Sequence, residues 1–328
     1  MLTYRNLYLK AALIFALLLA APALSQEVPE YGPPNGTLVI VGGNLKTQAI
    51  YDRFIQLAGG PDANFVIVPT AGGNKNPDGT IHVYKEEDVL AAWKKRGLKN
   101  VTMLHTHDPK VADTEEFVQN LRKANAVWFD GGRQWNIVDS YANTLTYKEF
   151  HKVLERGGVI AGSSAGATIQ GAYLVRGAIS GPDVVMAPEP EHQAGFAFLR
   201  RSAIDQHINA RSRWDDLIPV IKKFPDLLGI GLSEDTAIVV KSDTFEVMGA
   251  WKVAIYDNTR LYQPWEKPYY SSVTWRCVQH EDAQNRKAGR RHREAGPGSE
   301  KARIVRQQPA RMNTKRKLPE SISCQRYQ

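Results

Sequence analysis

Short runs of apolar and β-branched residues alternate with amphipathic segments between about residues 36 and 258. The apolar runs are expected to be buried strands over 37–41, 65–68, 101–104, 126–129 and 159–161. The segments between them have helical spacing over 45–58, 85–96, 114–123 and 146–156. Apolar strands separated by helices predict an α/β fold, in which a doubly wound, mostly parallel sheet has helices on both faces.

Three later runs lie too close together for helices to connect them. They cover residues 237–240, 244–247 and 252–256, and this spacing predicts an antiparallel edge to the sheet. We find no repeat and no linker inside this region. The sequence therefore predicts one domain over 36–270.

The N-terminus has the pattern of a secretory signal peptide over residues 1–25. An apolar run from Ala11 to Ala21 follows basic residues, and Pro22 with the small residues Ala23 and Ser25 comes next. The run is shorter than the ~20 apolar residues of a membrane-spanning helix. We therefore expect cleavage, a secreted or periplasmic protein without stable membrane association, and a short leader over 26–35.

The C-terminal segment 271–328 differs in composition from the rest. Residues 281–328 hold 13 Lys or Arg and only 5 Asp or Glu, so the net charge of +8 lies here and the rest of the chain is neutral. Apolar periodicity stops, which predicts a basic, disordered tail, with a polyanion-binding arm as the alternative. The basic residues lack interleaved aromatic side chains, so no nucleic-acid partner is expected. Both cysteines, Cys277 and Cys324, lie in this segment, which excludes a cysteine-based zinc site in the domain.

The strongest local motif is Gly162-Ser-Ser-Ala-Gly166, a G-x-S-x-G pattern. An apolar strand precedes it, and residues 165–173 can form a helix directly after it. A sharp strand-to-helix turn of this kind exposes a serine hydroxyl and places helix N–H groups beside it. The motif therefore predicts that Ser164 is a nucleophile, whereas a plain Gly/Ser turn is the alternative.

A serine nucleophile needs a base, and His207 is the histidine best placed to supply one. It lies in a polar segment that runs from Asp205 to Arg213, which alone is equally compatible with a hydrogen-bonded helix start. His105, His107 and Asp108 are a possible chelating set, but a solvated strand end explains them without a metal. No metal or organic cofactor is expected.

Two glycine pairs follow predicted strands. Gly131 and Gly132 lie in Phe129-Asp-Gly-Gly-Arg-Gln-Trp135, where the backbone can approach a ligand and present an N–H group. A tight βα turn is the alternative there. The other pair, in Val41-Gly-Gly-Asn44, lacks the G-x-G-x-x-G spacing of a dinucleotide site, so no nucleotide is expected.

Together these motifs resemble the serine peptidases that include cyanophycinase and dipeptidase E. The matching pieces occur in the family's order: Val39-Ile-Val-Gly-Gly43, Val68-Pro-Thr-Ala-Gly-Gly73, Phe129-Asp-Gly-Gly-Arg-Gln134, Gly162-Ser-Ser-Ala-Gly-Ala167, Ile204-Asp-Gln-His207 with Arg211 and Arg213, and Gly229-Ile-Gly-Leu-Ser-Glu-Asp-Thr-Ala-Ile-Val-Val240. The resemblance implies an α/β fold related to class I glutamine amidotransferase domains.

The resemblance also implies roles for individual residues. Ser164 matches the nucleophile, His207 the base, and the N–H groups of Gly132 and Ala165 the oxyanion hole. The substrate pocket is expected to contain Gln134, Arg133, Asp205, Gln206, Arg211 and Arg213. Arg133 stands where cyanophycinases more often carry Asp. For the third member of the triad we expect Asp183, with Glu191 as the alternative.

The sequence thus predicts a secreted serine peptidase that hydrolyses aspartyl peptide bonds, with cyanophycin (β-Asp-Arg units) as the expected substrate. An α-aspartyl dipeptidase of the dipeptidase E type is the first alternative. A non-catalytic binding protein is the second, because Ala178 stands where related sequences often have an acid. A metal hydrolase using His105, His107 and Asp108 is the third. The sequence does not fix the oligomeric state, and a homodimer is compatible with it.

Overall fold

The structure, a computed structural model, describes residues 28–76 and 78–257 and four short strands beyond them. These strands are β12 (Tyr269–Ser271), β13 (Trp275–Cys277), β14 (Ala302–Arg303) and β15 (Cys324–Arg326). The predicted signal peptide lies outside the described residues. Most of the predicted basic tail does so too, although the four strands were not anticipated in or beside it. Within the described ranges, no helix is long and apolar enough to cross a membrane.

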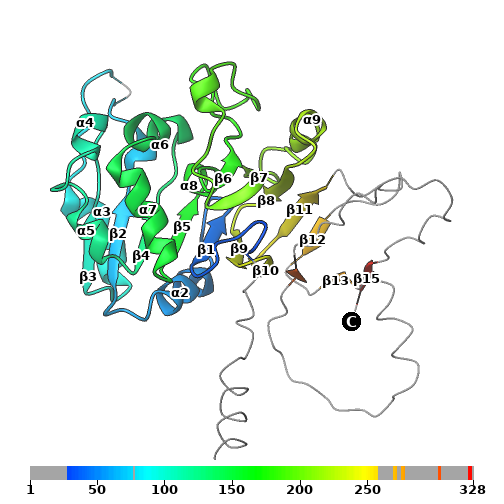
Figure 1. Ribbon diagram of the computed structural model, residues 1–328, viewed down its shortest axis with the longest axis horizontal. Coiled ribbons are helices and arrows are strands. Elements are labelled where there is room, and N and C mark those ends of the chain that lie inside the picture. Colours follow the sequence, from blue (N-terminus) through cyan, green and yellow to red (C-terminus); the bar gives the residue numbers. More distant parts are fainter. Residues whose placement is uncertain are drawn as a thin grey trace, which may run out of the picture.

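A parallel sheet lies at the centre of the fold (Figure 1). Its parallel strands are β1 (Thr37–Val41), β2 (Asn64–Val68), β3 (Asn100–Met103), β4 (Ala126–Phe129) and β5 (Val159–Ser163), in the order β1-β5-β4-β2-β3. On the other side of β1, β9 (Thr236–Lys241) and β10 (Thr244–Gly249) add antiparallel strands, and β14 follows them. The predicted α/β fold is confirmed, and two of the three strands predicted for its antiparallel edge, β9 and β10, lie there.

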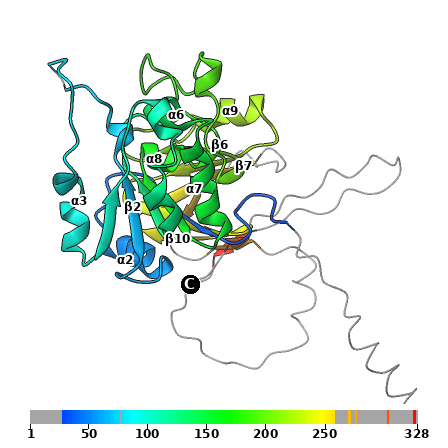
Figure 2. The same ribbon diagram turned by 60° about the vertical axis from the view of Figure 1, so that its left-hand side comes forward.

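Alternate residues of each parallel strand enter different cores, as expected for a sheet covered on both faces. In β1, Leu38 and Ile40 belong to one hydrophobic cluster, and Val39 and Val41 to the other. The first cluster includes residues of α6 (Gln134–Tyr141) and α7 (Leu145–Glu155), and the second includes residues of α2 (Gln48–Leu57) and α3 (Glu86–Lys95). Figure 2 shows the two helix layers on opposite sides of β2.

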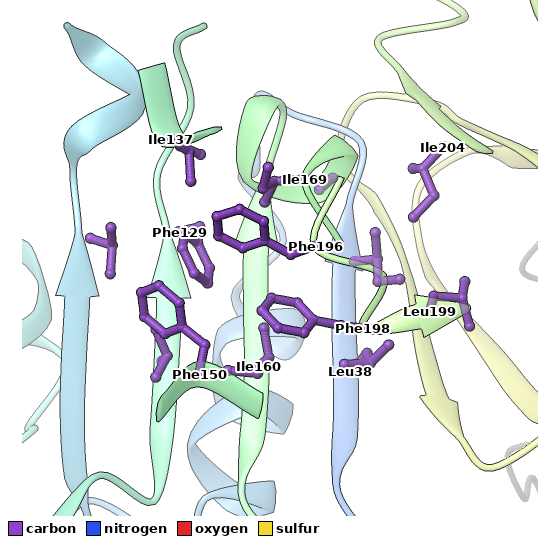
Figure 3. Packing of buried hydrophobic residues seen from close by; sticks show 14 of the residues in the cluster. Leu38, Phe129, Ile137, Phe150, Ile160, Ile169, Phe196, Phe198, Leu199 and Ile204 are labelled. Atoms are coloured by element: carbon purple, nitrogen blue, oxygen red, sulfur yellow. The ribbon is translucent and has the colours of Figure 1, made fainter. Parts of the chain in front are cut away.

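Aromatic side chains fill the centre of the first core (Figure 3). The rings of Phe129 and Phe150 lie 4.8 Å apart edge to face, and those of Phe196 and Phe198 lie 5.8 Å apart. Each of the four side chains is at most 2% exposed. Burial of one such side chain contributes about 1.5–3 kcal/mol to folding. This core supports β4 and β5, the two strands that lead into the glycine-containing turns of the predicted site.

A second sheet packs beside the first. Its order is β12-β11-β8-β7-β6, with β6 over Gly171–Tyr173, β7 over Leu199–Gln206, β8 over Leu228–Leu232 and β11 over Lys252–Tyr256. The helix α9 (Leu217–Lys223) joins β7 to β8, which run parallel. This sheet brings the end of β7 and the turn between β8 and β9 to the carboxyl end of β1.

Some elements differ from the sequence prediction. The predicted helix 165–173 is only α8 (Ala165–Thr168), because residues from Gly171 pair with β7 as β6. The predicted helix 114–123 is reduced to α5 (Gln119–Lys123), with α4 (Pro109–Ala112) before it. The strand β11 pairs with β8 in the second sheet and not with β10. The remaining short elements are the 3₁₀ turns Thr70–Gly72 and Pro190–His192.

Candidate active site

Ser164 occupies the sharp turn between β5 and α8. Its backbone has φ 57° and ψ −112°, a conformation that L-amino acids rarely adopt and that costs on the order of 1–3 kcal/mol. The Ser164 N–H donates to the Val41 carbonyl oxygen at 3.0 Å, which fastens the turn to the end of β1. The strained turn lifts the hydroxyl away from the sheet, as the motif predicts.

The two glycines of the G-x-S-x-G motif allow the turn to close. A β-carbon on Gly162 would lie 2.3 Å from the carbonyl oxygen of Gly166. A β-carbon on Gly166 would lie 2.1 Å from the carbonyl oxygen of Phe129. Both distances are well inside van der Waals contact with backbone atoms, which cannot move aside. The spacing of the motif therefore follows from packing in the turn.

His207 directly follows β7 and contacts the serine. Its Nε2 lies 2.9 Å from Ser164 Oγ, and its backbone N–H donates to the Gly42 carbonyl oxygen at 2.9 Å. The side chain is almost completely buried. The sequence prediction that residues 164 and 207 lie within hydrogen-bonding distance therefore agrees with this geometry.

Glu234, in the turn between β8 and β9, holds the other side of the imidazole. Its Oε1 lies 2.7 Å from His207 Nδ1. Its Oε2 accepts a 2.7 Å hydrogen bond from Asn44 Nδ2, and its backbone N–H donates to Asn209 Oδ1 at 2.8 Å. A carboxylate can only accept, so Nδ1 carries the proton and Nε2 is free to accept from the serine hydroxyl.

The ionisation of this pair suits base chemistry. Burial lowers the pKa of His207, the hydrogen bond to Glu234 raises it, and nearby Arg211 lowers it, with a net decrease below 6.5. The hydrogen bond from Asn44 lowers the pKa of Glu234, and burial opposes this effect. At neutral pH the imidazole is therefore neutral and the carboxylate is charged, as proton abstraction from a serine requires.

The prediction that Asp183 orients the imidazole is wrong. Asp183 is 96% exposed, and its nearest charged partner is Arg213, whose Nη2 lies 3.7 Å from Asp183 Oδ1. Glu191, the alternative, is an exposed residue of the 3₁₀ turn Pro190–His192. The contact of Glu234 with His207 was not predicted. The motif Gly229–Val240 contains this residue, but the sequence analysis assigned it no role. Its position just after a buried strand was the available signal.

Asp205, predicted to contact substrate, is instead part of a buried ion pair. It is completely buried, and its two carboxylate oxygens accept from Arg176 Nε at 2.9 Å and Arg176 Nη2 at 3.0 Å. Arg176 also donates to the Pro182 carbonyl oxygen at 2.6 Å and pairs with Asp216. The Asp205 carboxylate is thus already satisfied, and it supports β7 just before His207.

The other predicted pocket residues retain unused polar atoms. Among the described residues, Arg133 Nε, Gln206 Oε1 and Arg213 Nη1 are buried without a hydrogen-bond partner. Gln134 donates from Nε2 to the Val175 carbonyl oxygen at 2.6 Å, and Arg133 donates from Nη2 to that of Ala178 at the same distance. Arg211 is exposed, and its backbone N–H donates to the His207 carbonyl oxygen at 3.0 Å. Buried unsatisfied donors and acceptors of this kind are costly unless a ligand meets them.

The turn after β4 lies directly beside the serine. A β-carbon on Gly131 would lie 3.7 Å from Ser164 Oγ, so this backbone lines the space in front of the hydroxyl. Gly132, the next residue, has φ 145° and packs against the Ala71 carbonyl oxygen. Ala165 is the first residue of α8, so its N–H has no helical acceptor. Of the two residues predicted for the oxyanion hole, Ala165 thus directly follows Ser164, and Gly132 follows Gly131, which lies beside the serine side chain.

The three residues considered as a possible chelating set make other hydrogen bonds. His105 Nδ1 lies 3.0 Å from Thr70 Oγ1, and His107 Nδ1 lies 3.3 Å from Ser140 Oγ. Asp108 caps α4 by accepting from the Lys110 N–H at 2.9 Å. In the described part of the chain, no group of three or more His, Cys, Asp or Glu side chains has the arrangement of a metal site.

Comparisons with known proteins show which family this chain resembles. The family model described as Peptidase family S51 matches residues 38–248. The chain is 28% identical over 241 residues to a cyanophycinase of Synechococcus elongatus, covering 71% of this chain and 72% of the relative. It is 27% identical over 230 residues to a cyanophycinase of Geminocystis herdmanii, covering 69% of this chain and 82% of the relative.

A solved structure supports the fold. The crystal structure of a peptidase from an acI-B1 Actinobacterium aligns with a TM-score of 0.54 and 23% identity, covering 74% of this chain and 96% of that one. The match of the family model spans well over half of the chain. The chain belongs to peptidase family S51 and is a serine peptidase, which confirms the resemblance seen in the motifs.

Proposed function

We propose that this serine peptidase hydrolyses aspartyl peptide bonds, with cyanophycin as its substrate, through a triad of Ser164, His207 and Glu234. The observation that carries the proposal is the continuous hydrogen-bond chain from Ser164 Oγ through both imidazole nitrogens to Glu234 Oε1, with distances of 2.9 and 2.7 Å. The similarity to two cyanophycinases supports the substrate. The buried, unpaired guanidinium nitrogen of Arg213 supports recognition of a carboxylate.

The reaction follows from these contacts. Ser164 Oγ attacks the carbonyl carbon of the scissile bond as His207 Nε2 takes the hydroxyl proton. Glu234 stabilises the imidazolium that forms. The N–H groups of Gly132 and Ala165 donate to the oxyanion, and each such donor lowers the barrier by about 3 kcal/mol. The tetrahedral intermediate then expels the amine, which takes the proton from His207. Water, activated by the same imidazole, hydrolyses the acyl-enzyme and regenerates Ser164.

The test is digestion of insoluble cyanophycin by the purified protein, with released dipeptide followed by mass spectrometry. We expect β-Asp-Arg release by the wild type and a decrease of at least 10⁴-fold in Ser164→Ala, since loss of a triad nucleophile costs roughly 10⁶-fold in comparable enzymes. Asp-X dipeptides serve as the comparison substrates for an α-aspartyl dipeptidase. Release from these dipeptides and not from the polymer would overturn the substrate assignment.

A fluorophosphonate probe tests the nucleophile without any assumption about substrate. Labelling of the wild type at Ser164, together with no labelling of Ser164→Ala, is the expected result. Absence of labelling in both proteins would favour the non-catalytic binding protein considered above.

Export is a separate part of the proposal, supported by the apolar run from Ala11 to Ala21. We propose that the mature protein begins near residue 26. The test is N-terminal sequencing of the protein from expressing cells and from their surroundings. A cell-retained protein that keeps Met1 would overturn this part.

A further inference from the structure

A cavity of about 350 Å³ opens on the face of the central sheet that α2 and α3 cover. Its walls include the aromatic side chains of Tyr51, Trp93 and Trp128. These rings belong to one aromatic group, in which Tyr51 and Trp128 stack at 5.8 Å and Trp93 and Trp128 meet at 5.1 Å. The walls are therefore set by core packing and do not depend on a bound ligand.

The cavity adjoins the nucleophile. Ser163 and Gly131 both line it, and they are the residues next to Ser164 and Gly132 in the chain. A β-carbon on Gly131 would lie 3.2 Å from Ser164 Cβ, so little more than the width of a backbone separates the cavity from the serine. Gln206 is the last residue of β7, and Arg213 lies in the loop after it, so neither comes from this face. The cavity therefore gives a substrate held at Ser164 a separate direction in which to extend.

Asp130 is the single carboxylate among the residues that line the cavity. Its Oδ1 accepts a 3.0 Å hydrogen bond from Trp128 Nε1, and no cationic side chain within the described ranges pairs with it. Burial raises the pKa of Asp130 to about 6, and the hydrogen bond from Trp128 partly offsets this rise. Above that pH the carboxylate is charged and lacks a counter-ion in an aromatic enclosure, where a bound cation would stabilise it.

Arg96 supplies the opposite charge in the same cavity. Its guanidinium carbon lies 3.9 Å from the centre of the Tyr51 ring, and its Nη1 donates to the Ala92 carbonyl oxygen at 2.9 Å. Its Nε is buried without a partner among the described residues. Arg96 and Asp130 do not pair with each other, so the cavity presents a separated positive and negative group.

We propose that this cavity binds a zwitterionic arginine unit of the substrate, with its guanidinium group on Asp130 and its carboxylate on Arg96. The aromatic walls suit a guanidinium, which is planar, weakly hydrated and attracted to ring faces. A carboxylate meets the fixed fork of an arginine in bidentate geometry. The inference rests on the proposed function. It specifies which part of cyanophycin, an arginine unit, occupies the cavity beside Ser163.

Binding measurements test the cavity apart from catalysis. Calorimetric titration of Ser164→Ala, which retains the cavity, would use Nα-acetyl-L-arginine as the probe. Two probes differ from it by one group each: Nα-acetyl-L-citrulline lacks the positive charge, and Nα-acetylagmatine lacks the carboxylate. We expect each to bind at least tenfold more weakly, because each leaves the half-buried charge of Asp130 or Arg96 without its counterpart.

Variants then assign the two ends of the ligand. Asp130→Asn is expected to weaken the binding of Nα-acetyl-L-arginine at least tenfold. This probe should then bind no more tightly than the citrulline probe. In Arg96→Gln, Nα-acetyl-L-arginine is expected to bind no more tightly than the agmatine probe. Asp88→Asn and Lys95→Gln, exposed neighbours on α3, are the matched controls and should bind as the parent does. Circular dichroism and a melting curve establish that each variant is folded.

The outcomes separate the two proposals. Equal binding of the arginine and citrulline probes, or unchanged binding in folded Asp130→Asn, overturns the cavity assignment even if the protein digests cyanophycin. Asp130-dependent binding in a protein that does not digest cyanophycin upholds the cavity and overturns the proposed function. If Asp130→Asn fails to fold, the affinity of the parent for Nα-acetyl-L-arginine is measured as a function of pH instead. The affinity should fall as the pH is lowered through about 6, where Asp130 becomes protonated. An affinity that does not change with pH overturns the assignment.

Discussion

Gly43 lies directly against the ring of His207. A β-carbon on Gly43 would be 2.1 Å from His207 Cε1 and 2.5 Å from Nε2, the atom that contacts the serine hydroxyl. The absence of a side chain at the end of β1 is therefore a condition for the position of the base. The glycine pair after β1 holds the imidazole, a role that the sequence analysis did not assign to it.

Substitution of this glycine should displace the base. Gly43→Ala is expected to lower kcat/KM at least 100-fold, because a displacement of about 1 Å can cost that factor. The residue also has φ 107°, so strain alone would lower stability. Gly59→Ala is the matched control, since Gly59 has φ 105° and its nearest neighbour would be 4.0 Å away. Equal losses of activity in the two variants would contradict the proposed contact.

Glu234→Gln tests the assignment of the acid. We expect kcat to fall by roughly 10²–10⁴-fold, because the amide no longer stabilises the imidazolium and can favour the wrong tautomer. Glu234 raises the pKa of His207, so its neutralisation should lower that pKa further. Activity requires neutral His207, and the acidic limb of the pH profile of kcat/KM should therefore move to lower pH. Glu191→Gln, at an exposed site, should match the wild type in both measurements.

The buried pair of Arg176 and Asp205 should matter for stability. Arg176→Met leaves a completely buried carboxylate without its partner, and loss of one member of such a pair costs about 3–5 kcal/mol. The free energy of unfolding in urea measures this effect. The double variant Arg176→Met/Asp205→Leu should recover part of the loss, since no completely buried charge then lacks a partner and the remaining carboxylate, that of Asp216, is partly exposed. A double variant as unstable as the sum of the single ones would argue against the ion-pair explanation.

Because the backbone at Ser164 is strained, we expect that a substitution which relieves the strain raises stability while it removes activity. Ser164→Gly should be inactive but more stable than Ser164→Ala by about 1 kcal/mol, because glycine adopts φ 57° without strain. For a domain of this size, that difference raises the melting temperature by about 2–4 °C. Ser163→Gly, one residue earlier in β5, should instead lower the melting temperature. A Ser164→Gly variant no more stable than Ser164→Ala would show that the turn stores no strain.

The parallel sheet and the sharp turn at Ser164 could be predicted because their signals are local. Apolar runs such as Val39 to Val41 and the strand–turn–helix order around Ser164 are visible within a few residues. The partners of those residues are not local. Whether Asp205 contacts a ligand or Arg176 depends on how a loop 29 residues away folds over β7. Glu234 reaches His207 because β9 pairs with β1, and that pairing has no sequence signal of its own.

The same nonlocality explains the misassigned helix after Ser164. A stretch that begins Ala-Gly-Ala-Thr can start a helix, but residues from Gly171 onward gain more hydrogen bonds as an edge strand beside β7. Tertiary pairing overrides local propensity at such places. The cavity beside Ser163 was equally unpredictable, because Arg96 and Asp130 lie 34 positions apart in the sequence and line one cavity only in the folded chain.

The hydrogen-bond chain is assembled from three positions that leave the ribosome in the order serine, histidine, glutamate. Glu234 reaches His207 from the turn that leads into β9, and the next residue, Asp235, fixes that turn by accepting from the backbone N–H groups of Lys46 and Thr47 at 2.8 and 2.7 Å. A nascent chain that has not yet formed β9 therefore has the Ser164 hydroxyl but lacks the contact between Glu234 and His207. We expect the growing polypeptide to be inert toward its surroundings until the last antiparallel strands dock.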